Sequence, residues 1–192
     1  MKTNATNLKR GDFIFFRNEI WQIIKTIFSF QGRGMANIKF KIKSIKSGKN
    51  IDVTLKSNEQ LDTVDVTLEK MQYLYSDKDT LFFMNKTYNQ FFVSKKIIGD
   101  FYQFLKEGDD YYIYIYEDKA LTLKKPEKVI LKVTESQEAV KGDTTGSAKK
   151  KVKTQTGVEV LVPLSIKKDD DIVVDPETGD YIERFTNKNK NS

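Results

Sequence analysis

Short runs of alternating hydrophobic and polar residues dominate the chain, and two of them flank a segment that contains two glycines. Residues 20–30 are rich in Ile, Phe and Trp, a composition typical of strands. Residues 37–43 alternate strictly, with Ile38, Phe40 and Ile42 on one face and Asn37, Lys39, Lys41 and Lys43 on the other. The two runs predict a β-hairpin that carries Arg33 at its tip, since the flanking glycines allow a tight reversal.

Further short runs extend this pattern through the first third of the chain. Residues 13–16 and 51–55 predict additional strands, and a small all-β barrel over residues 1–64 accounts for their number and spacing. Residues 57–63 are polar and are predicted to be a link to the next unit.

The middle third, residues 65–128, predicts strands, a helix and then more strands. Strands are expected at 64–68, 72–76 and 80–84, followed by a helix that Ser94 caps and that runs to about Lys106. Gly108 would end this helix. The order is that of an OB-fold barrel.

The most aromatic run, residues 111–116, places Tyr112, Tyr114 and Tyr116 on one face of a predicted strand. Such a face can stack on the bases of single-stranded RNA. Cross-strand aromatic packing explains the same residues without a ligand, and we favour packing because this third is slightly acidic.

The last third, residues 129–192, predicts a second small barrel of this kind, with strands at 129–133, 158–163, 171–175 and 179–184. Residues 139–147 are rich in turn formers and predict an ordered loop, whereas the lysines at 149–151 predict a solvated loop. Asp169 to Asp171 could suggest a metal site, but neighbouring carboxylates on a strand point to opposite faces, so we interpret them as a loop. A disordered tail is expected from about residue 187.

Composition narrows the function classes. The 192 residues contain no His and no Cys, which excludes His-dependent and thiol nucleophiles in cis and removes the commonest metal ligands. We therefore expect no enzyme activity, no cofactor and no metal. No apolar run approaches the roughly 18 residues of a membrane span, and no signal peptide is apparent, so we expect a cytoplasmic monomer without a membrane partner.

The net charge of +6 is concentrated at the start of the chain. Residues 1–64 contain 12 Lys and Arg against 5 Asp and Glu, or +7, while the next two thirds carry −1 (10 against 11) and 0 (11 against 11). A basic surface of this kind indicates a polyanionic partner, most often nucleic acid. Lys39, Lys41 and Lys43 are the candidate contacts to the RNA backbone.

Several motifs, in the same order along residues 8–185, resemble those of the bacterial elongation factor P family. They are Lys9-Arg10-Gly11-Asp12, Gly32-Arg33-Gly34, Tyr73-Leu74-Tyr75-Ser76-Asp77 with Phe83-Met84-Asn85, Val140-Lys141-Gly142-Asp143-Thr144, residues 156–163, and Thr178-Gly179-Asp180-Tyr181. The resemblance implies an SH3-like (KOW-type) barrel followed by two OB-fold barrels, in an L-shaped arrangement that resembles tRNA. The three domains would be residues 1–64, 65–128 and 129–192.

The resemblance also implies a function. Such factors bind the 70S ribosome, with its rRNA of both subunits, beside P-site peptidyl-tRNA, and they relieve stalling at consecutive prolines. By position, the loop tip at the peptidyl-transferase centre corresponds to Gln31, Gly32, Arg33, Gly34 and Met35. Tyr181 and Arg184 correspond to contacts of the third domain with the small subunit and tRNA.

The tip departs from the commonest family pattern. Many relatives carry a lysine after Pro-Gly, whereas this chain has Gln31 and Gly32 before Arg33. Lysine-directed β-lysylation is excluded at Arg33. Some relatives carry arginine there, and in one subgroup it is rhamnosylated, so an arginine-modifying enzyme is a candidate partner.

The last barrel also departs from the usual family signature, since Lys168 and Asp169 replace an apolar residue and a glycine.

Two other readings stay open. A paralogue of elongation factor P would serve stalling sequences other than consecutive prolines. A ribosome-independent OB-fold module would bind single-stranded RNA through the tyrosines at 112, 114 and 116.

Overall fold

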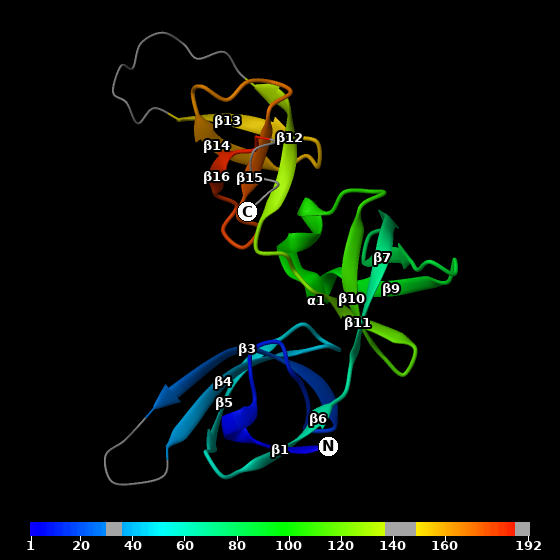
Figure 1. Cartoon of the computed structure of the whole chain (residues 1–192), viewed down its shortest axis with the longest axis vertical. Coiled ribbons are helices and arrows are strands. Elements are labelled where there is room, and N and C mark those ends of the chain that lie inside the picture. Colours follow the sequence, from blue (N-terminus) through cyan, green and yellow to red (C-terminus); the bar gives the residue numbers. More distant parts are fainter. Residues whose placement is uncertain (30–35, 137–148, 187–192) are drawn as a thin grey trace. The chain divides into compact units, whose positions relative to one another are not determined.

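The computed structural model describes residues 1–29, 36–136 and 149–186. Its strands form three antiparallel sheets, one in each third of the chain (Figure 1). The first two sheets belong to one compact unit, residues 1–99 and 107–124, and residues 100–106 and 125–192 form a second unit. None of the described helices is long and apolar enough to cross a bilayer. The all-β prediction is confirmed, whereas the L-shaped arrangement and the domain boundaries stay predictions.

The first sheet has the strand order β1-β6-β2-β3-β4-β5. Its strands are β1 (Lys2–Asn4), β2 (Phe13–Phe16), β3 (Glu19–Ser29), β4 (Asn37–Ser44), β5 (Asn50–Lys56) and β6 (Gln60–Val64), with a 3-10 turn at Ala5–Asn7. The predicted polar link at 57–63 is wrong, because Gln60–Val64 pairs with both β1 and β2. Ladder partners on both sides satisfy the backbone of this polar segment, which a reading of hydrophobicity alone does not detect.

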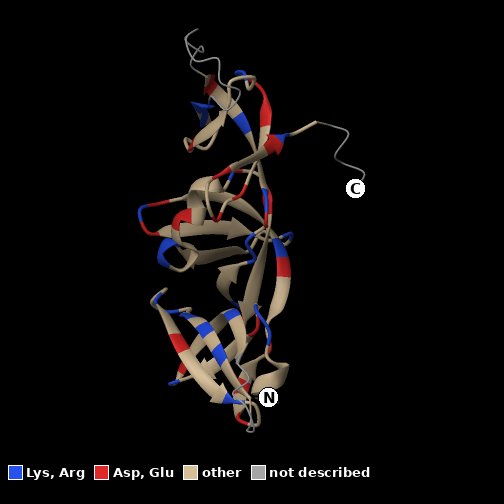
Figure 2. Ribbon diagram, turned by 90° about the vertical axis from the view of Figure 1, so that its left-hand side faces the viewer, with Lys and Arg blue, Asp and Glu red and all other residues tan. Residues whose placement is uncertain are grey.

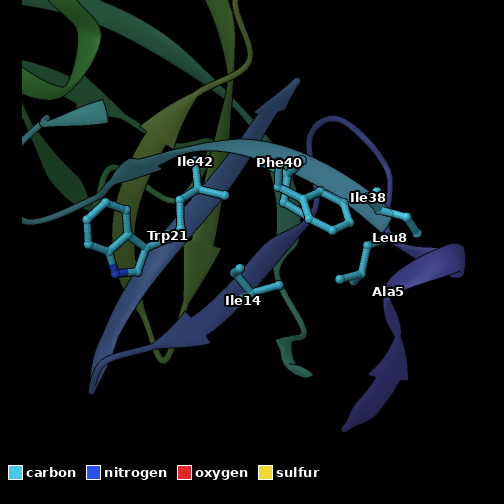
Figure 3. Packing of buried hydrophobic residues seen from close by; sticks show 8 residues of the cluster. Ala5, Leu8, Ile14, Trp21, Ile38, Phe40 and Ile42 are labelled. Carbon is cyan, nitrogen blue, oxygen red and sulfur yellow. The ribbon is translucent and has the colours of Figure 1, made fainter. Parts of the chain in front are cut away.

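The curved first sheet wraps around one hydrophobic cluster (Figure 3). Its buried members, none more than 7% exposed, are Ala5, Leu8, Ile14, Trp21, Ile23, Ile38, Phe40 and Ile42. The predicted apolar face of β4 is therefore confirmed.

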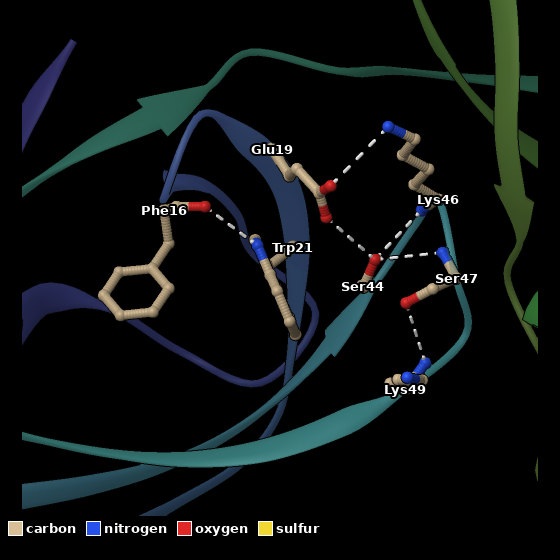
Figure 4. A network of polar contacts seen from close by, with 7 residues as sticks. All are labelled: Phe16, Glu19, Trp21, Ser44, Lys46, Ser47 and Lys49. Atoms are coloured by element: carbon tan, nitrogen blue, oxygen red, sulfur yellow. Dashed lines mark hydrogen bonds and ion pairs between the residues drawn. The ribbon is translucent and has the colours of Figure 1, made fainter.

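A network of polar contacts holds the turn after β4 (Figure 4). The hydroxyl of Ser44, a fully buried residue, accepts hydrogen bonds from the backbone N–H groups of Lys46 and Ser47 and donates one to Glu19 at 3.3 Å. Trp21 Nε1 donates to the carbonyl of Phe16 at 2.9 Å on the neighbouring β2–β3 turn. The Trp21–Ser44 end of the β3–β4 ladder is thus anchored on both strands.

The second sheet has the order β11-β10-β7-β8-β9, and its edge strands β9 and β11 also contact each other, which nearly closes it into a barrel. Its strands are β7 (Thr67–Ser76), β8 (Thr80–Met84), β9 (Gln90–Ser94), β10 (Asp110–Tyr116) and β11 (Lys119–Leu123). The strand predicted at 64–68 is wrong, because Val64 ends β6 in the first sheet and β7 begins only at Thr67.

The predicted helix is shorter than expected. Ser94 caps it as predicted, accepting from the N–H of Lys96, but α1 spans only Lys95–Ile98. Gly99, with φ of 66°, interrupts the α-helix, and a 3-10 helix follows at Gly99–Phe104. Ile98 is buried, whereas Ile97 is only partly buried.

The third sheet has the order β14-β13-β12-β15-β16. Its strands are β12 (Val129–Ser136), β13 (Lys149–Thr154), β14 (Glu159–Pro163), β15 (Asp171–Val174) and β16 (Tyr181–Arg184). The predicted solvated loop at 149–151 is wrong, because these lysines begin β13 and pair with β14. Asp169 and Asp170 lie in a turn before β15, and no metal-binding group of three acidic side chains occurs among the described residues. The ordered loop predicted at 139–147 and the tail from 187 lie outside the described residues.

Candidate nucleic-acid interface

The hairpin formed by β3 and β4 is the framework of the candidate site. Its ladder runs from the pair Trp21–Ser44 to the pair Ser29–Asn37, and β5 pairs along the other side of β4. The predicted tip, from Gln31 to Met35 and including Arg33, lies outside the described residues, so its role stays a prediction.

The face of this sheet opposite the core is strongly basic. Directly paired residues share a face, and the paired rows on this face are Gln22–Lys43–Asn50, Lys25–Lys41–Asp52, Ile27–Lys39–Thr54 and Asn37–Lys56. These rows hold five lysines and one aspartate, a net +4. We call this set the lysine face. Figure 2 shows several Lys and Arg positions along the strands of the first sheet.

The predicted backbone contacts Lys39, Lys41 and Lys43 all lie on this face but are not equivalent. Lys39 Nζ is 2.9 Å from Asp52 Oδ2, so its charge is already paired. Burial lowers the pKa of Lys43, which is only partly accessible. Lys41 is exposed and takes part in none of the salt bridges between described residues. It is the most available cation of the three.

Lys25 is the residue that sequence reasoning missed. A β-bulge at Ile24 shifts the register between Ile23 and Lys25, so Lys25 lies directly opposite Lys41. The signal in the sequence is the pair of adjacent isoleucines, which breaks the alternation of β3.

The third sheet brings Tyr181, Arg184 and Asp170 together. Arg184 Nη2 donates to Asp170 Oδ2 and to the carbonyl of Ser165, the latter at 3.2 Å. Desolvation acts to raise the pKa of Asp170, but hydrogen bonds from the Lys167 N–H and Arg184 outweigh it, and the pKa is lowered. Desolvation raises the pKa of Tyr181. The cluster positions Arg184, although one of its nitrogens is already engaged within the protein.

The tyrosines of β10 mostly pack within the protein. The ring centroid of Tyr114 lies 4.9 Å from that of Phe13, and Tyr116 lies 6.2 Å from Phe15, both edge to face. Tyr112 is 49% exposed. Only this one of the three rings offers a large open surface, which favours the packing interpretation over base stacking.

A row of aromatic rings on the outside of the second sheet was also missed. Tyr75 stacks on Phe82 at 4.5 Å, Phe82 contacts Phe92 edge to face, and Tyr75 and Phe92 are about half exposed. The β-bulge at Leu74 places Tyr75 opposite Phe82, and no regular alternation in the sequence signals it.

Comparison with known proteins identifies the architecture. Residues 4–61 match the family model "Elongation factor P (EF-P) KOW-like domain", residues 66–123 match "Elongation factor P (EF-P) OB domain", and residues 129–184 match "Elongation factor P, C-terminal". The KOW-type and OB predictions for the first two barrels are confirmed.

Individual relatives match over nearly the whole chain. Elongation factor P of Leptospira biflexa serovar Patoc is 38% identical over 185 residues, covering 96% of this chain and 98% of the relative. Elongation factor P of Phytoplasma australiense is 35% identical over 187 residues, covering 96% and 99%. A solved structure, "Eukaryotic translation initiation factor 5A from Methanococcus jannaschii", aligns with a TM-score of 0.48 at 16% identity, over 65% of this chain and 94% of that one.

The three family models and the elongation factor P relatives define the chain as a translation factor built from small β-barrels. It belongs to the elongation factor P family.

Proposed function

We propose that the protein binds the 70S ribosome beside P-site peptidyl-tRNA and stimulates peptide-bond formation between consecutive prolines. The observation that carries this proposal, beyond family membership, is the lysine face on a hairpin whose second strand, β4, buries Ile38, Phe40 and Ile42 on its other side. Such a hairpin holds cations at fixed spacing along a nucleic-acid backbone and leads directly into the segment that contains Arg33.

The chemistry we propose is positioning rather than catalysis by the protein. Proline reacts slowly in peptide transfer because its ring constrains the nucleophile and the peptidyl end. Fixing the CCA end of the tRNA reduces the entropic part of the barrier, a term worth up to about 7–11 kcal/mol for ideally oriented reactants and less for a guided tRNA. Arg33 suits the tip, since a guanidinium stays charged and can contact phosphate or stack on a base. Tyr181 and Arg184 would add contacts to tRNA and the small subunit.

The test is the single-turnover rate of Pro-Pro bond formation on purified ribosomes. It compares no factor, the protein made without modifying enzymes, and its Arg33→Ala variant. We expect strong stimulation by the wild type and none by the variant, with ribosome binding largely retained by both. Equal loss of binding and stimulation in the variant would make Arg33 an affinity contact instead.

Three other outcomes would each lead to a different conclusion. Absence of stimulation by either form, together with a heavier intact mass for native protein, indicates a required modification of Arg33. Stimulation only at stalling sequences without prolines favours the paralogue. Tight binding of free single-stranded RNA would favour an independent RNA-binding module, a reading that the packed Tyr114 and Tyr116 disfavour.

A further inference from the structure

The lysine face contains one feature that family membership does not explain, a directly opposed pair of lysines. Lys25 on β3 and Lys41 on β4 are ladder partners, and both are exposed. Like charges directly opposite each other destabilise a sheet. Among the described residues, neither side chain has a carboxylate within salt-bridge distance.

A bulge in β3 creates this pair. Ile23 pairs with Ile42 and Lys25 pairs with Lys41, so Ile24 is the extra residue. Without it, Ile24 would oppose Lys41, and Lys25 would oppose Phe40 in the core. Bulges re-aim side chains in this way near functional sites.

The neighbouring acid does not relieve the repulsion. Asp52 is the ladder partner of Lys41 on its other side, yet its carboxylate bonds Lys39 at 2.9 Å in the next row. The charge of Lys39 is thus balanced within the protein, while Lys25 and Lys41 stay open to an external anion.

We infer that Lys25 and Lys41 together bind one phosphodiester group of the RNA that the hairpin contacts. Opposed residues on neighbouring strands have Cβ atoms about 4.5–5.5 Å apart, so two flexible ammonium groups can reach the oxygens of a single phosphate. The bound anion replaces the repulsion between them with two attractions. This inference rests on the proposed function and adds Lys25 to the binding surface.

The expected size follows from counterion release. Each phosphate contact changes the slope of log K against log salt by about 0.7 to 0.9. At 0.1 M salt, complete loss of one such contact therefore weakens binding roughly five- to eightfold, which is the upper limit for a change of Lys25 alone because Lys41 still faces the phosphate. The loss should shrink as salt rises.

The experiment uses the full chain and ribosomes that hold peptidyl-prolyl-tRNA in the P site. Binding is measured between 0.05 and 0.2 M KCl for the wild type, Lys25→Gln, Lys25→Glu and the matched controls Lys119→Gln and Lys119→Glu. Lys119 is an exposed lysine at the start of β11, so each control changes the net charge equally. A parallel arm with vacant ribosomes tells whether the phosphate belongs to tRNA or to rRNA.

We expect Lys25→Gln to lose the predicted affinity and slope, Lys25→Glu to lose more, and both controls to stay near the wild type. Lys25→Glu should also melt at or above the wild-type temperature, because it converts a repulsive cross-strand pair into an attractive one. Binding by the Lys25 variants equal to that of the Lys119 controls would overturn the inference, as would a lowered melting temperature that accounts for the lost binding.

Failure of this inference can be distinguished from failure of the proposed function. A wild type that neither binds ribosomes nor stimulates would refute the proposed function and this inference together. A wild type that does both, with Lys25 variants like their controls, refutes only the phosphate pair.

Discussion

Replacing Asp52 with asparagine should make the protein bind RNA with a steeper dependence on salt. Asp52 is the only acid on the lysine face, and its carboxylate holds Lys39 at 2.9 Å. The Asp52→Asn variant keeps the shape of the side chain but releases the ammonium of Lys39. One more cation then becomes available to neutralise a phosphate.

The Asp52→Asn variant should lose a little folding stability and gain a steeper salt dependence of RNA binding. The side chains of Lys39 and Asp52 are 49% and 52% exposed, and pairs this exposed contribute only about 0.2–1 kcal/mol to folding. The variant should therefore fold almost as stably as the wild type. An added phosphate contact steepens the salt slope by about 0.7–0.9, so a fourfold rise in salt should cost the variant roughly threefold more affinity than the wild type.

The assay is ribosome binding between 0.05 and 0.2 M KCl. The matched control is Asp110→Asn in the second sheet, which releases Lys70 from a pair of similar geometry, 3.0 Å long and with 50% and 47% exposure. The control changes net charge equally but should leave the slope unchanged. A slope for Asp52→Asn equal to that of the wild type or the control would show that Lys39 does not meet a phosphate.

Two further predictions concern stability. Gly48 has φ of +71°, and a Cβ there would lie 2.4 Å from the backbone oxygen of Lys96, so Gly48→Ala should destabilise more than Gly108→Ala, where φ is +85° but no atom lies within 4 Å. The strain of a positive φ alone costs about 1–2 kcal/mol at either site. Equal losses in the free energy of unfolding of the two variants, measured in urea, would show that the backbone at Lys96 moves away from the added Cβ at little cost. The pKa of Asp170 lies below its ordinary 3.8, so its contribution to stability is complete above that value and disappears as pH falls through the lowered pKa. Asp170→Asn should therefore differ from the wild type at neutral pH and converge with it in acid, and a constant difference would refute the role of its charge.

The sequence was informative where one pattern decided the structure. The alternation of β4 predicted both its buried face and its lysines, and the cap at Ser94 was correct. The hydrophobic pattern gave wrong predictions where pairing with neighbouring strands determined the structure. Strand β6 is polar and exists because β1 and β2 supply ladder partners, and Lys149 begins β13 because β14 pairs with it.

The candidate site shows the same division. Lys39, Lys41 and Lys43 could be assigned to one face from their spacing alone. Lys25 could not, because the direction of its side chain depends on a one-residue bulge. The ion pair that engages Lys39 could not be predicted either, because Asp52 lies on a third strand, β5. Both effects arise from pairing between segments that are separate in the sequence.

The burial of Phe13 has a consequence for how the chain is made. This β2 side chain is only 2% exposed and belongs to a cluster with Val64 and Leu121, against which Tyr114 packs. The first sheet is synthesised well before β10 and β11, so a nascent or truncated chain that ends ahead of them would leave Phe13 and Val64 open to solvent. Premature termination in the middle third should therefore yield a fragment with exposed hydrophobic side chains. Such a fragment is prone to aggregate and is a target for chaperones and proteases, and it does not form a stable N-terminal domain.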